Sequence, residues 1–116
     1  MPPTLQQRLG RQGEDRALAH LQAHGLTLLE RNFLCKSGEI DLVMQDGAVL
    51  VFVEVRRRAS GKFGGAVYSV TPAKQQRLLR AAQFYLLRHK LPPPCRFDLV
   101  AMDDQKLSWI QNALEM

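Results

Sequence analysis

The dipeptide Asp46-Gly47 lies between two segments with the composition of β-strands, and it constrains the fold more than any other feature of the sequence. Both residues tolerate the positive φ angles that a two-residue hairpin turn requires. The segments before and after the turn, 39–45 and 48–56, are rich in apolar and β-branched residues. We therefore predict an antiparallel hairpin whose second strand, the more apolar one, lies centrally in a sheet.

The turn also predicts which side chains face each other across the hairpin. If it pairs Gln45 with Ala48, counting outward places Glu39 opposite Glu54, with Asp41 on the diagonal. Because side chains alternate along a strand, one face of the hairpin should be wholly apolar. That face holds Ile40, Leu42, Met44, Val49, Val51 and Val53. The other face ends in four charged residues, which are Glu39, Asp41, Glu54 and Arg56.

The acids on this face need an explanation, because like charges that oppose each other destabilise a sheet. A divalent cation would remove the repulsion, and carboxylate oxygens suit Mg²⁺ or Mn²⁺. We therefore interpret Asp41 and Glu54 as metal ligands. The alternative is a set of structural ion pairs with Arg56 and neighbouring arginines. For Glu39 we favour such an ion pair, or exposure to solvent, over a role as a ligand.

The other elements follow from hydrophobic periodicity and from capping residues. In chain order we predict a helix capped by Thr4 and ended by Gly25, strands at 26–33, 39–45 and 48–56, a helix from Thr71-Pro72 to about Lys90, a strand at 96–102 and a candidate strand at 106–111. This order of helix, three strands, helix, and one or two strands favours an α/β fold with a mixed central sheet flanked by helices. A chain of 116 residues is expected to form one domain.

Charge is distributed unevenly along the chain, which carries a net charge of +5. No acidic residue lies between Glu54 and Asp98, whereas this interval is rich in arginine and lysine. A block of one sign on a folded domain attracts polyanions, so we expect nucleic acid as a partner. The alternative is a solvated basic face without a partner. The residues expected to contact the phosphate backbone are Arg57, Arg58, Lys62, Lys74 and Arg77.

Several motifs occur together between residues 8 and 102. They are Gly13-Glu14, Arg31-Asn32, Gly38-Glu39-Ile40-Asp41-Leu42, Val51-Phe52-Val53-Glu54-Val55-Arg56-Arg57-Arg58 and Arg96-Phe97-Asp98. In combination they resemble the YraN-like family of uncharacterised bacterial proteins. The resemblance implies kinship with PD-(D/E)xK nucleases and archaeal Holliday junction resolvases, and so a restriction-endonuclease-like fold. It also implies that Asp41 is the motif aspartate, Glu54 the second acid, and Glu14 a helix-borne glutamate near the metal.

One position departs from the nuclease motif. Two residues after the second acid the motif has lysine, and this chain has Arg56. A lysine can orient or help to deprotonate the attacking water, whereas arginine stays protonated and serves only to stabilise charge on the phosphate. The change is compatible with metal binding but makes efficient cleavage questionable. Lys74, in the first turn of the second predicted helix, is a candidate for the missing amine; otherwise it is an exposed basic residue.

The expected function is that of an endonuclease dependent on Mg²⁺ or Mn²⁺, acting on DNA, with branched DNA as a candidate substrate. Its catalytic residues would be Asp41, Glu54, Arg56 and Glu14. The first alternative is a nuclease-fold module that binds nucleic acid without cutting it, and the second is an interaction protein whose hairpin acids form structural ion pairs. By analogy with resolvases a homodimer is expected. The sequence shows no bilayer-spanning or secretory segment, so we expect a cytoplasmic location.

Overall fold

A computed structural model describes residues 2–57 and 70–114 of the chain. The elements in this part are α1 (Leu5–Ala23), β1 (Thr27–Cys35), β2 (Gly38–Asp46), β3 (Val49–Arg57), α3 (Pro72–Leu86), β4 (Cys95–Met102) and β5 (Leu107–Leu114). The five strands form one sheet in the order β1-β2-β3-β4-β5, with β3 and β4 parallel and the other neighbours antiparallel. This confirms the predicted mixed α/β fold, and the layout is that of a restriction-endonuclease-like domain. No helix among the described residues has the length and apolar character to cross a bilayer.

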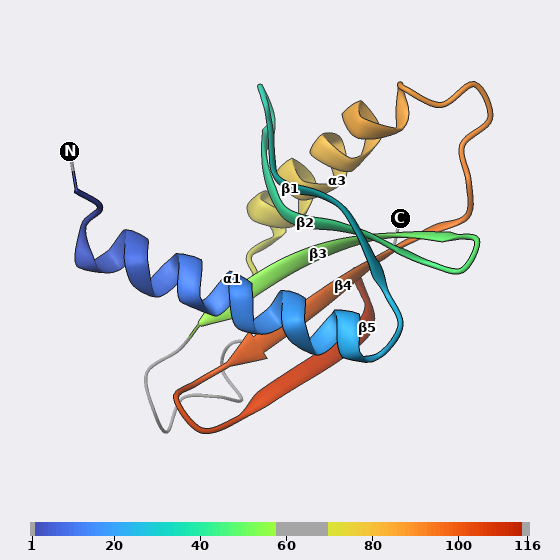
Figure 1. The fold of residues 1–116 in the computed structure, drawn as a ribbon. Helices are drawn as coiled ribbons and strands as arrows, with labels where there is room; N and C mark the ends of the chain where they lie inside the picture. The colour runs from blue at the N-terminus through green and yellow to red at the C-terminus, as the bar shows by residue number, and fades with distance from the viewer. Residues whose placement is uncertain (1, 58–69, 115–116) are drawn as a thin grey trace.

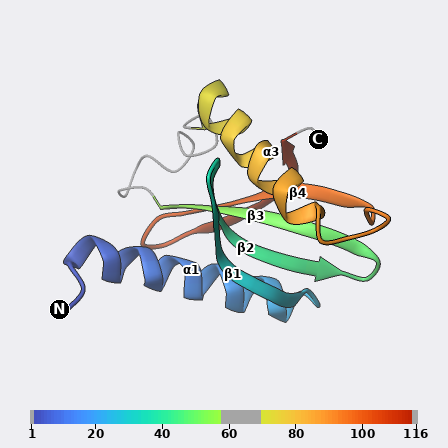
Figure 2. The same cartoon turned by 90° about the horizontal axis from the view of Figure 1, so that it is seen from above.

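The two helices cover opposite faces of the sheet, which is seen edge-on between them in Figure 2. Under α1 the core contains Ala17, Leu21, Leu42, Met44, Val51 and Val53. Under α3 it contains Phe33, Val43, Phe52, Leu78, Ala82 and Tyr85. The central strand β3 therefore contributes to both cores, as its apolar composition predicts.

Both helices begin at the predicted caps. The hydroxyl of Thr4 accepts a hydrogen bond from the Gln7 amide, and that of Thr71 accepts one from the Lys74 amide. The second helix ends at Leu86, earlier than the predicted Lys90. Beyond Leu86 the amides bond to carbonyls three residues back, as in His89 N to Leu86 O at 3.0 Å. This tighter turn ends the α-helix before the proline-rich segment.

The hairpin forms, but its register differs from the predicted one. Asp46 pairs with Val49, so the turn is Gly47-Ala48, and Gln45 faces Leu50 rather than Ala48. Asp46 stays in the strand, where its carboxylate lies 3.1 Å from Arg96 Nη1. The prediction that Glu39 faces Glu54 is therefore wrong. The shift amounts to an even number of residues, so each side chain keeps its face of the sheet.

The apolar face has one exception, which is Ile40. It packs in the core under α3, whereas Leu42 and Met44 pack under α1. The pairing of β2 with β3 ends at Leu42, and beyond it the β1–β2 ribbon curves away from the sheet toward α3 (Figure 1). The curvature breaks the simple alternation on which the prediction relied.

A buried carboxylate ties β5 to β4. Asp98 is fully buried, and its Oδ1 accepts hydrogen bonds from Arg96 Nε and the Asn112 amide, both at 3.0 Å. Its Oδ2 accepts one from Trp109 Nε1 at 2.9 Å. The predicted fifth strand is thus confirmed and anchored by a satisfied buried charge.

We expect Asp98→Asn to lower the free energy of unfolding by about 2–3 kcal/mol, because the amide presents N–H groups to donors and removes the charge that balances Arg96. Urea unfolding measures the change. The matched control is Asp104→Asn, which removes an exposed carboxylate paired with Arg57 and should cost less than about 0.5 kcal/mol. Equal costs for the two variants would contradict a stabilising role for the buried carboxylate.

Candidate metal centre

Asp41 of β2 and Glu54 of β3 meet where the two strands separate. Continuing the register beyond the Leu42–Val53 pair places them opposite each other. Asp41 Oδ2 accepts a hydrogen bond of 2.8 Å from the Val55 amide, and Glu54 is only 4% exposed. The pKa of Asp41 is raised to about 9. Burial is the largest cause, and the hydrogen bond with Glu54 and the negative charge of Glu54 add to it. Without a cation, Asp41 therefore holds a proton at neutral pH and donates it toward Glu54.

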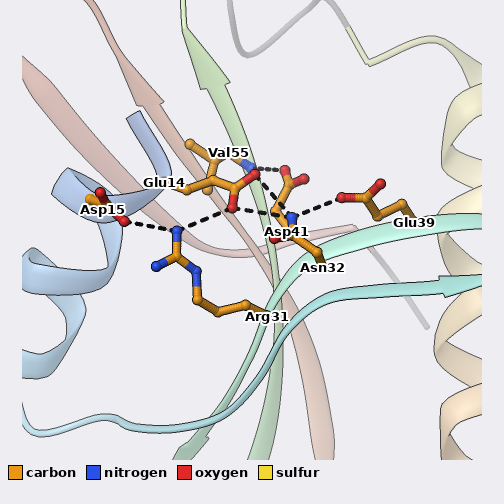
Figure 3. Close-up of polar contacts among 7 residues, drawn as sticks. All are labelled: Glu14, Asp15, Arg31, Asn32, Glu39, Asp41 and Val55. Atoms are coloured by element: carbon orange, nitrogen blue, oxygen red, sulfur yellow. Dashed lines mark hydrogen bonds and ion pairs between the residues drawn. The ribbon is translucent and has the colours of Figure 1, made fainter. Parts of the chain in front are cut away.

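Two further acids approach Asp41, as Figure 3 shows. Glu14 comes from α1 and Glu39 from β2, and one oxygen of each lies within 4.8 Å of the others and of an Asp41 oxygen. Asn32 of β1 joins them, because its Nδ2 lies 3.1 Å from both Glu14 oxygens and 2.8 Å from Glu39 Oε1. Asn32 has φ of 52°, a left-handed conformation that asparagine tolerates better than most residues.

Arg31, the neighbour of Asn32, holds the helix side of the cluster. Its Nη2 lies 2.8 Å from Asp15 Oδ1 and 3.4 Å from Glu14 Oε1. The two residues of the Arg31-Asn32 motif thus contact both consecutive acids of α1. They orient Glu14 toward the strands rather than toward solvent (Figure 3).

Lys74 reaches the acids from the opposite side. Its Nζ lies 2.8 Å from Glu54 Oε2, and its side chain is 32% exposed. Glu54 Oε2 receives no well-directed hydrogen bond from the described residues, so the contact with Lys74 is an ion pair. The capping bond from the Lys74 amide to Thr71 fixes the first turn of α3 and hence the position of this side chain.

An open cleft of about 250 Å³ runs beside these side chains, between the start of β2 and the start of α3. The described residues that line it are Gly38, Glu39, Asp41, Glu54, Lys74, Arg77 and Leu78. Lys74, Arg77 and Leu78 share one face of α3, since residues three and four apart are neighbours on a helix. The cleft therefore has acids on its sheet side and cations on its helix side.

The sequence-predicted ligands come together only in part as expected. Glu54 contacts Asp41, whereas Glu14 approaches Asp41 together with Glu39. The sequence predicts an ion pair or exposure to solvent for Glu39; its side chain is exposed, and its carboxylate also lies in the acidic cluster. Asn32 was not among the predicted site residues. The motif Arg31-Asn32 was the available signal for it.

Arg56 is half-buried and is not among the described residues that line the cleft. Arg77 lines it and is exposed. Arg57 pairs with Asp104 at the end of the sheet near α1. Arg58 and Lys62 lie outside the described residues. Of the residues predicted to contact phosphate, the structure describes Arg57, Lys74 and Arg77. Lys74 and Arg77 line the cleft, and Arg57 does not.

Other residues of the basic block serve the fold. Arg88 pairs with Glu30 and stacks on Tyr85, with its guanidinium carbon 3.9 Å from the ring centre. Arg96 pairs with Asp46 and Asp98. The interval without acids is therefore neutralised in part by acids from other segments, which a count along the sequence does not show.

The donor set fits a hard divalent cation. It offers carboxylate oxygens, which Mg²⁺ and Mn²⁺ prefer, and the spacing within 4.8 Å in the Glu14, Glu39 and Asp41 group allows one ion to contact several of them. The proton on Asp41 also fits, because a cation would take its place and remove the cost of ionising a buried acid beside Glu54.

Comparison with known proteins yields one family. The model of the uncharacterised protein family UPF0102 matches residues 13–102. A UPF0102 protein of Janthinobacterium sp. (strain Marseille) is 60% identical over 114 residues, which cover 98% of this chain and 93% of that protein. One of Herminiimonas arsenicoxydans is 59% identical, covering 98% and 92%, and one of Ralstonia pickettii (strain 12J) is 51% identical, covering 97% and 94%.

Proposed function

This chain belongs to the uncharacterised YraN-like family UPF0102, and from its carboxylate centre we propose that it is a divalent-metal-dependent endonuclease that hydrolyses phosphodiester bonds in DNA, including branched DNA. The observation that carries the proposal is the meeting of Asp41 and Glu54 in a cleft whose opposite wall presents Lys74 and Arg77. Acids that hold a cation and cations that hold a phosphate are the two requirements of metal-assisted phosphodiester hydrolysis.

In this proposal Asp41, Glu54 and Glu14 hold Mg²⁺ or Mn²⁺, and Glu39 is a further candidate ligand. The bound metal would polarise the scissile phosphate and lower the pKa of the attacking water. Asp41 gives up its proton when the ion binds, and the Val55 amide continues to orient its carboxylate. Asn32 holds Glu14 and Glu39 in place, as partners of metal ligands commonly do.

The first turns of α3 are the proposed contact with the nucleic acid backbone. Arg77 and Arg80 are exposed there, one helical turn apart, and Arg77 also lines the cleft. Contacts of this kind read phosphate rather than base sequence. DNA is favoured over RNA by the resemblance to resolvases. A homodimer and a cytoplasmic location stay predictions.

We expect Arg77→Gln with Arg80→Gln to weaken binding of every DNA form and to reduce the slope of log affinity against log salt by about 2, one unit for each lost phosphate contact. Fluorescence anisotropy over a salt series measures both quantities. The matched control is Arg8→Gln with Arg11→Gln, which removes the same charge from exposed positions on α1, across the sheet. Equal slopes for the two double variants would contradict a specific contact at α3.

The replacement of the motif lysine by Arg56 favours a second candidate, a module that binds nucleic acid without cutting it. Duplex, single-stranded and four-way-junction DNA incubated with Mn²⁺ distinguish the two functions. Cleavage by the wild type that requires the metal supports the endonuclease. Binding without cleavage, by the wild type and by Arg56→Lys alike, would favour the second candidate instead.

A further inference from the structure

The cleft contains a cation that the nuclease motif does not place there. Arg56 occupies the motif position, but among the described residues the cations that line the cleft are Lys74 and Arg77 of α3. Of these, Lys74 lies against an acid of the centre, 2.8 Å from Glu54 Oε2. The amine of Lys74 therefore reaches the carboxylate centre from α3, which follows β3 in the chain.

The position of Lys74 in α3 is unfavourable for a lysine. Thr71 is the N-cap and Pro72 the first helical residue, so Lys74 lies in the first turn, where the helix dipole is positive. That turn contains no acidic residue. An ammonium at the positive end of a helix strengthens the attraction of that end for anions. In the absence of a ligand, the carboxylate of Glu54 is the anion that pairs with Lys74. A phosphate group is the anion that a nucleic acid would bring to the same place.

We propose that the ammonium of Lys74 contacts the reacting phosphate of a bound nucleic acid, in place of the lysine absent at position 56. This inference rests on the proposed function. With a cation held by Glu54, this carboxylate would no longer need the charge of Lys74, and the ammonium would be released to donate hydrogen bonds to a non-bridging phosphate oxygen. Arg77, on the same face of α3, binds a neighbouring phosphate.

The reaction that Lys74 would assist is a hydrolysis. The oxygen of water forms a bond to phosphorus, the bond from phosphorus to the leaving oxygen breaks, and the proton lost by water ends on the leaving oxygen, directly or through solvent. Lys74 stays protonated throughout and offsets the negative charge that develops on the phosphate. Its role as a charged donor therefore requires neither an oxidant nor a second substrate.

The experiment compares wild type, Lys74→Gln, the double variant Lys74→Gln with Arg56→Lys, and Lys106→Gln as the control. Lys106 is an exposed lysine before β5, away from the cleft. Lys74→Met, which keeps the apolar stem of the side chain, repeats the test if glutamine loosens the helix start. Calorimetry with Mn²⁺ checks that each variant keeps a folded metal site. Cleavage is measured with Mn²⁺, and DNA binding is measured with Ca²⁺ as the ion.

We expect Lys74→Gln to bind Mn²⁺ at least as tightly as the wild type does, because the ammonium no longer competes for Glu54, but to cut DNA about 100-fold more slowly. Lysine returned to position 56 should recover at least about tenfold of that loss, which a merely structural role for Lys74 would not allow. In Ca²⁺ the same variant should lose about one unit of salt slope in DNA binding, while Lys106→Gln loses none.

Cleavage by Lys74→Gln at the wild-type rate would overturn the inference. If the wild type cuts no DNA form, the proposed function fails, and binding in Ca²⁺ then decides the inference alone. An unchanged salt slope for Lys74→Gln overturns it in that case, and a slope reduced by one unit supports it.

Discussion

Replacing Asp41 and Glu54 together by alanine is expected to abolish detectable Mn²⁺ binding, with a loss of affinity of at least about 100-fold. The two residues provide the oxygens at the point where β2 and β3 separate, and no other acid lines the cleft there except Glu39 among the described residues. Without them, the half-buried Glu14 and the exposed Glu39 remain on Asn32 as a pair that weakly attracts any cation. Isothermal calorimetry with Mn²⁺ measures the affinity, and DNA cleavage should disappear with it.

The control for this variant removes two acids of the same types from elsewhere. Glu30→Ala with Asp104→Ala breaks exposed ion pairs with Arg88 and Arg57, so it lowers the negative charge equally but leaves the cleft intact. It should bind Mn²⁺ like the wild type. If Asp41 and Glu54 can be removed without a change in affinity, the metal site lies elsewhere and the proposed function loses its basis.

Single substitutions then assign the remaining ligands. Glu14→Gln and Glu39→Gln each keep the hydrogen-bonding shape at Asn32 but remove one charge. We interpret a loss of affinity for only one of them as the identification of the third carboxylate. A loss for both would indicate that the cation lies within the Glu14, Glu39 and Asp41 group.

The sequence predicted the faces of the central hairpin better than its pairing. Asp46-Gly47 located the hairpin, but the turn formed at Gly47-Ala48 because Asp46 remains in the strand beside Arg96. That contact joins β2 to β4 and is invisible to local turn rules. The prediction of one face for Asp41 and Glu54 survived, since the error in register was an even number of residues.

The sequence did not predict how residues outside the β2–β3 hairpin pairing join the carboxylate centre. Asn32 holds Glu39 beside Glu14 near Asp41, and the β1–β2 ribbon that carries Asn32 and Glu39 curves away from β3 (Figure 1). Lys74 reaches Glu54 across the cleft from α3. Such convergence depends on the curvature of β2 and on where α3 crosses the sheet. Neither follows from periodicity within a segment, so residue types could nominate Lys74 but could not place it.

The stability of the metal-free protein is expected to fall by about 2–4 kcal/mol between about pH 5 and pH 8. In the folded chain the pKa of Asp41 is raised to about 9, whereas in the unfolded chain an aspartate titrates near its ordinary value of about 3.9. Between these values the folded state holds a proton that the unfolded state has released. Stability is therefore fully present below the unfolded pKa and is lost progressively as the pH rises toward the folded one.

Asp41→Asn tests the origin of this slope, because an amide can donate to Glu54 at any pH without ionising. Urea unfolding in the presence of a chelator should show a nearly flat profile for the variant, which becomes more stable than the wild type at the alkaline end. Saturating Mn²⁺ should then stabilise the wild type, by about 2.7 kcal/mol at a hundredfold excess over the dissociation constant, and leave Asp41→Asn unchanged. Parallel profiles for the two proteins would show that Asp41 is already ionised in the folded chain. If the protein gains stability both when Asp41 loses its charge and when a cation neutralises it, the carboxylate centre destabilises the metal-free fold. Its residues then serve metal binding rather than folding.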